Sequence, residues 1–113
     1  MVRGMVEQHP GWQVCGEACD GAEAVQRATE LRPDVIVMDL VMPKLNGLEA
    51  TRKIHELSPS ARVLILTLHE NPVLPKIAQD SGANGYVVKS ESLDTLTRAI
   101  ESVGESNRFF VAH

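Results

Sequence analysis

The sequence of 113 residues has few cysteines, few aromatic residues and no long apolar run. Cys15 and Cys19 are the only cysteines, and no histidine pair at metal-ligand spacing accompanies them to complete a zinc site. No stretch approaches the roughly 20 apolar residues that cross a bilayer, and the N-terminus lacks the charged-then-apolar layout of a signal peptide. We therefore expect a cytoplasmic protein with no membrane contact, in which both cysteines are small, reduced core residues.

An excess of positive charge is also missing. The chain has 11 Lys and Arg against 15 Asp and Glu, a net charge of −4. Direct binding to nucleic acid needs clustered Lys and Arg to neutralise phosphates, and no such cluster is present. A partner is therefore expected to be a protein. The length and the 43% hydrophobic content predict one domain with a single core.

Apolar, β-rich runs alternate along the chain with segments of helical period. Strands are predicted at residues 13–18, 34–39, 62–67 and 85–89. Helices are predicted at residues 1–8, 20–31, 46–57, 73–81 and 90–103. Strands as apolar as these are typical of a parallel sheet covered on both faces. The pattern predicts an α/β fold, a doubly wound parallel sheet with right-handed crossovers.

Two of the predicted helices carry finer signals. Asp20 and Glu23 have the spacing of an N-cap and its capping-box partner. Pro75 would remove a hydrogen bond inside the helix at 73–81, which we expect to be short and mobile. The buried face of the helix at 46–57 is predicted to hold Leu48, Thr51, Ile54 and Leu57.

Three of the predicted strands end on reactive side chains: Asp39, Thr67 and Lys89. The carboxyl ends of parallel strands lie along one edge of the sheet, so we expect the three to share a pocket there. A carboxylate in such a place can be a metal ligand or a nucleophile that holds a phosphoryl group as an aspartyl phosphate. Lys89 would offset the negative charge, and the Thr67 hydroxyl could hydrogen-bond a phosphoryl oxygen.

The segment Arg32–Ala50, with Leu66-Thr67 and Gly85–Lys89, resembles the response regulator receiver domain of two-component signal transduction. It is similar in particular to the branch that precedes a LuxR-type helix-turn-helix domain, and the similarity covers essentially the whole chain. The resemblance implies a flavodoxin-like receiver fold and a signalling domain that is not an enzyme, phosphorylated by a sensor histidine kinase in a phosphorelay.

The resemblance also implies roles for single residues. Asp39 would accept the phosphoryl group and bind Mg²⁺ together with the backbone carbonyl of Val41. Thr67 and Lys89 would engage the phosphoryl group. Tyr86 would be the aromatic whose rotamer follows Thr67, and its movement would reshape the surface formed by the fourth helix, the last strand and the last helix.

One part of the family pattern is missing. A complete receiver opens with a strand and two adjacent acids that hold Mg²⁺, whereas the only acids before Asp20 are Glu7 and Glu17. We therefore expect residues 1–103 to be a receiver lacking its first strand and acidic pair, with weak or absent Mg²⁺ binding and impaired phosphorylation. Residues 104–113 would begin a linker to an absent LuxR-type DNA-binding domain that controls transcription.

The missing strand has a structural consequence. In the family's strand order, 2-1-3-4-5, the first strand is central, and its absence would leave unpaired backbone groups on two neighbours. Either the strands at 13–18 and 34–39 pair directly, or a second copy of the chain donates a strand or covers the exposed edges, as a homodimer or a swapped assembly. We expect the second outcome.

Other function classes fit less well. A pseudo-receiver that docks partners or dimerises without phosphorylation is the main alternative, and the missing acids favour it. An aspartyl-nucleophile phosphohydrolase would need a second Asp two positions after the first, where this chain has Val41. A nucleotide-binding protein would need a glycine-rich loop after a strand, whereas Gly82 and Gly85 precede one.

Overall fold

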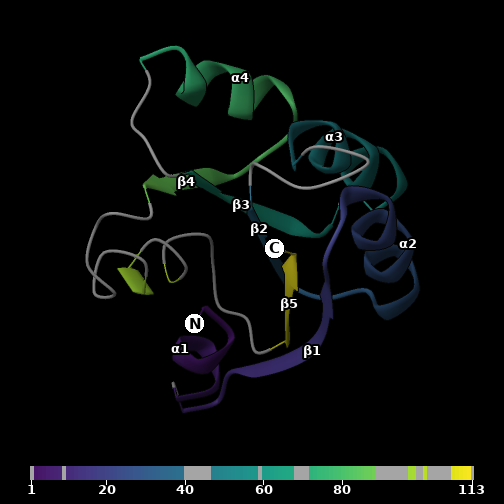
Figure 1. The fold of residues 1–113 in the computed structure, drawn as a ribbon, viewed down its shortest axis with the longest axis vertical. Coiled ribbons are helices and arrows are strands. Elements are labelled where there is room, and N and C mark those ends of the chain that lie inside the picture. Colours follow the sequence, from purple (N-terminus) through teal and green to yellow (C-terminus); the bar gives the residue numbers. More distant parts are fainter. Residues whose placement is uncertain are drawn as a thin grey trace.

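The computed structural model describes residues 2–8, 10–39, 47–58, 60–67, 72–88, 97–98, 101 and 108–112. Within these, five parallel strands form one sheet in the order β1-β5-β2-β3-β4 (Figure 1). They are β1 (Gln13–Ala18), β2 (Val35–Asp39), β3 (Arg62–Thr67), β4 (Gly85–Val88) and β5 (Arg108–Ala112). The predicted α/β fold with a parallel sheet is confirmed.

Helices cover both faces of the sheet. They are α1 (Val2–Gln8), α2 (Gly21–Leu31), α3 (Gly47–Leu57) and α4 (Leu74–Asp80). Helices α2 and α3 lie side by side on one face, and Figure 1 shows α1 away from them, across the sheet. No helix in the described ranges is long and apolar enough to cross a membrane. The layers are those of a doubly wound sheet.

Each face has its own apolar core. Beneath α2 and α3 the core joins helix residues to one side of the strands: Ala24, Ala28, Ala50, Ile54, Ile36, Met38, Val63, Ile65 and Phe110. On the α1 face the buried residues are Val6, Val35, Val37, Leu64, Leu66, Val87 and Phe109. Alternate residues of β2 and β3 point to opposite faces, so their continuous apolar runs fill both cores.

Strand β5 is an interior strand of the sheet and differs from our expectation of a linker. It pairs with β1 on one side and β2 on the other, with Phe110 aligned with both Gly16 and Ile36. The gap between β1 and β2 is therefore filled from within the same chain, neither by direct pairing nor by a second copy. The run Arg108–Ala112 suits this place because Phe109 and Phe110 supply one buried aromatic ring to each face.

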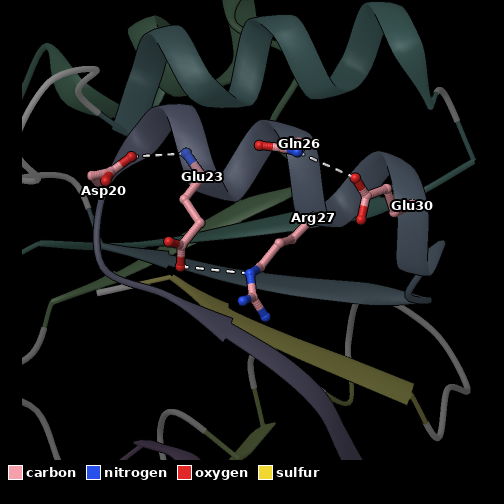
Figure 2. Close-up of polar contacts among 5 residues, drawn as sticks. All are labelled: Asp20, Glu23, Gln26, Arg27 and Glu30. Carbon is pink, nitrogen blue, oxygen red and sulfur yellow. Dashed lines mark hydrogen bonds and ion pairs between the residues drawn. The ribbon is translucent and has the colours of Figure 1, made fainter.

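The start of α2 follows the sequence prediction. The Asp20 side chain accepts a hydrogen bond from the backbone N–H of Glu23 at 2.7 Å, which confirms the N-cap (Figure 2). The Glu23 carboxylate lies 3.6 Å from Arg27 Nε, with both side chains 41% or more exposed. A cap of this kind stabilises a helix by about 1 kcal/mol, more than an exposed pair one turn apart, so Asp20 sets where α2 begins.

Three smaller predictions are corrected. Leu57 is 59% exposed because it is the last residue of α3, where the chain turns toward β3; the buried residues are Gly47, Ala50, Thr51 and Ile54. Cys19 is exposed rather than in the core, whereas Cys15 is half-buried against it. Pro75 lies in the first turn of α4, where its missing N–H breaks no helical hydrogen bond.

Gly82, which follows α4, is predicted to be intolerant of substitution. Its φ is +96°, and a Cβ placed there would lie 2.6 Å from His55 Cγ and 2.8 Å from His55 Cβ. These atoms are close to the His55 backbone, so rotation of the imidazole would not relieve the contact. Gly82→Ala should lower the free energy of unfolding by at least about 1–2 kcal/mol, measured by urea denaturation.

Gly4→Ala is the matched control for Gly82→Ala. Gly4 lies inside α1, and a Cβ there would have no atom within 4 Å. Alanine is favoured over glycine in a helix by about 1 kcal/mol, so this variant should be neutral or slightly stabilised. Equal urea midpoints for the two variants would contradict the strain assigned to position 82.

Candidate functional site

Asp39 and Thr67 end neighbouring strands at the same edge of the sheet. The parallel strands β2 and β3 place Asp39 beside Leu66, so that Thr67 is the next residue along β3. Thr67 in turn is aligned with Val88, the last residue of β4. The predicted placement of Asp39 and Thr67 at one edge is confirmed. Lys89 and Val41 lie outside the described residues.

The two side chains differ in exposure. Asp39 is half-buried and follows four fully buried residues of β2, so its carboxylate stands where the apolar strand meets solvent. Thr67 is 6% exposed. A half-buried carboxylate at a strand end remains accessible to a ligand, whereas a nearly buried hydroxyl has few positions and is well placed to make one directed hydrogen bond.

Tyr86 lies on the same face of the sheet as Thr67. It is aligned with Ile65, which is two positions before Thr67 on β3 and so shares its face. The ring is half-buried and packs against the core beneath α2 and α3. It also lines a groove of about 260 Å³ between α4 and β4, together with Pro75, Ala78, Gln79, Ala83, Asn84 and Gly85.

The described residues do not make a metal site by themselves. No group of three or more His, Cys, Asp or Glu that could hold a metal ion is found in the described part of the chain. On the side of β2 away from β3 lies β5, whose last residue, Ala112, is aligned with Met38 and with Ala18. Mg²⁺ prefers one or two carboxylates in octahedral oxygen coordination, and Asp39 is the strand-end carboxylate available here.

Asp20 is the next acid after β1, but its side chain already has a structural role. One carboxylate oxygen accepts the hydrogen bond from Glu23 N that starts α2. Using this carboxylate as a metal ligand would compete with the helix cap. The described residues therefore fit Mg²⁺ poorly.

Comparison with known proteins gives a family match. The sequence matches the response regulator receiver domain over residues 1–101. The response regulator GacA of Pseudomonas aeruginosa is 37% identical over 105 residues, which is 93% of this chain and 49% of GacA. The chain thus spans about half the length of the curated relatives it matches. Strand β5 lies beyond the matched residues.

Solved structures agree with this match. A two-component response regulator of the LuxR family from Aurantimonas sp. SI85-9A1 is 41% identical, with a TM-score of 0.86 over 90% of this chain and 73% of that one. The receiver domain of a sensor histidine kinase from Pseudomonas aeruginosa PAO1 is 27% identical, with a TM-score of 0.76 over 89% of this chain and 83% of that one. That structure holds a magnesium ion coordinated in its active-site cleft.

Proposed function

Because the chain belongs to the response regulator receiver domain family, we propose that it is a phosphoacceptor in two-component signal transduction and that Asp39 accepts the phosphoryl group. One observation carries this proposal. Asp39 and Thr67 end adjacent parallel strands at one edge of the sheet, within the residues that match the family. Ligands and chemistry of open α/β sheets occur at this edge.

In the proposed reaction a carboxylate oxygen of Asp39 attacks the phosphorus of a phosphohistidine on a sensor histidine kinase. The new P–O bond forms as the P–N bond breaks, and the imidazole leaves with the electron pair. Thr67 donates its hydroxyl hydrogen to a phosphoryl oxygen. Lys89, which directly follows β4 in the sequence, neutralises part of the added charge.

We further propose that this chain binds Mg²⁺ weakly and is phosphorylated slowly. Asp39 and the backbone carbonyl of Val41 would be the metal ligands, and the described residues add no neighbouring acidic pair. Asp39 supplies one carboxylate, the lower limit of the one or two that Mg²⁺ sites usually include together with water, and this supports the proposal.

Phosphorylation would act on Tyr86 through Thr67. Movement of the Thr67 hydroxyl toward the phosphoryl group would free space along the face that Tyr86 shares. Tyr86 also lines the groove beside α4, so a change of its rotamer would alter that groove. Phosphorylation would thus change the charge at Asp39 and favour one of two arrangements of Tyr86 and the groove beside it.

The proposed output is transcriptional control through a LuxR-type DNA-binding domain absent from these residues. Similarity to GacA and to a LuxR-family response regulator supports this proposal. The chain itself, with a net charge of −4, would not bind DNA. A second copy of the chain is a further proposed partner.

A pseudo-receiver that docks proteins without phosphorylation is the competing function. It is favoured by Ala112, because β5 ends beside β2 in an apolar residue and not in an acid. It is disfavoured by the placement of Asp39 and Thr67 at the ends of adjacent strands, at the edge where open α/β sheets bind their ligands.

Incubation with acetyl phosphate and Mg²⁺, followed by intact-mass spectrometry, distinguishes these functions. The unmodified chain should gain one phosphoryl group slowly and incompletely, whereas Asp39→Asn should gain none. Asp80→Asn is the matched control, because Asp80 is exposed on α4 and its weak 4.0 Å contact with Lys76 is remote from the edge.

Each other result has a distinct meaning. Labelling of the Asp39→Asn variant would show that another residue is the acceptor. Rapid, stoichiometric labelling of the unmodified chain would contradict the weak Mg²⁺ site. Complete absence of labelling at high Mg²⁺ would support the docking function instead.

A further inference from the structure

Strand β5 is held by the first third of the chain. Its main packing partners are β1, β2, α1 and α2, all within residues 2–39. Both rows of its backbone groups are paired, one with β1 and one with β2. The space between β1 and β2, which we call the strand slot, is thus lined mainly by residues 2–39.

The shape of the strand slot matches the aromatic residues of β5. Gly16 is aligned with Phe110, and a Cβ on Gly16 would lie 3.2 Å from the Phe110 ring and 2.7 Å from Leu31 Cδ1. The missing side chain at position 16 therefore makes room for Phe110, which is fully buried. On the other face, the centroid of the Phe109 ring lies 4.9 Å from the centroid of the Trp12 ring.

The first residue of β5 is fixed by polar contacts. Arg108 N donates to Asp34 Oδ2 at 3.1 Å, and Asp34 N donates to Arg108 O at 2.9 Å. The Arg108 guanidinium also donates to the carbonyl of Arg32 at 3.2 Å. These hydrogen bonds fix the register of β5, which begins at Arg108. The apolar residues that follow Arg108 fill the slot.

We propose that the strand slot is a binding site for an extended apolar strand and that it accepts β5 from a second copy of the chain, giving a strand-exchanged dimer. The main contacts of β5 all fall on residues 2–39, so a second copy can supply the same strand with the same contacts. Exchange of identical elements between copies is a low-cost route to dimers, and main-chain pairing of an added strand is a common form of recognition.

The tether within one chain competes with exchange. A segment joined to its own binding site has an effective concentration on the order of millimolar, so a dimer requires refolding at high chain concentration. This inference specifies the self-association proposed above and does not depend on phosphorylation of Asp39.

Disulfide trapping between two refolded chains tests the exchange. In a background with Cys15→Ser and Cys19→Ser, one chain carries Glu17→Cys and the other Val111→Cys, since Glu17 and Val111 are register partners. Co-refolding at high concentration should give a covalent heterodimer whose yield rises with concentration. Asp39→Asn in both chains should leave the yield unchanged, which separates this result from the failure of phosphotransfer.

Gln13→Cys with Val111→Cys is the control, because Gln13 is aligned with Arg108 instead. Its heterodimer yield should be several-fold lower. Equal yields for the two pairs would overturn the proposal, provided that a single chain carrying both Glu17→Cys and Val111→Cys closes its disulfide within one chain. Failure of that single chain to close it would also overturn the proposal, since the register of β5 would then be wrong.

Complementation between two defective chains gives an independent measurement. Gly16→Leu blocks the slot but keeps β5, whereas Phe110→Asp keeps the slot but places a charge in β5. Trp12, the sole tryptophan, reports occupation of the slot through its contact with Phe109. Mixing the two chains should shift the emission and form a dimer by light scattering, and a mixture equal to the sum of its parts would contradict exchange.

Discussion

A strand in the interior of a parallel sheet has to pair its backbone on both sides, and this requirement shapes the whole molecule. Between β1 and β2 it is met by β5, a segment far away in sequence. Unpaired, β1 and β2 would leave two rows of N–H and C=O groups in an apolar environment, each buried group costing roughly 1–3 kcal/mol. The rings of Phe109 and Phe110 complete the two cores at the same time.

The candidate site depends on this arrangement. With β5 in place, β2 is an interior strand, and its buried residues hold Asp39 at the edge next to the end of β3. The same strand also defines what the site lacks, because the described part of β5 ends in Ala112 rather than in an acid. One segment thus completes the sheet without supplying a carboxylate.

Membership of the receiver family and the position of β5 are consistent with each other. The family match covers residues 1–101, and the sheet formed by those residues has a place for one more strand between β1 and β2. The strand that fits between β1 and β2 is selected by backbone pairing and by the size of its alternate side chains, and not by a long sequence motif. Gly16 opposite Phe110 is the most specific part of that selection.

Local sequence pattern was enough to predict three features. The bounds of β1 follow from its run of strand-forming residues, and the N-cap of α2 follows from capping chemistry. The common edge that holds Asp39 and Thr67 follows from the parallel direction of the strands. The apolar run Arg108–Ala112 was a signal for a strand, but its partners are remote, and no local rule says which edge or gap a short strand will fill. The exposure of Leu57 also depended on where α3 ends, and the first-turn position of Pro75 on where α4 begins. The sequence by itself determined the α/β class and the candidate residues, since these follow from short-range order. Only the tertiary structure decided that β5 lies between β1 and β2, because that choice is made by burial and backbone pairing over the whole sheet.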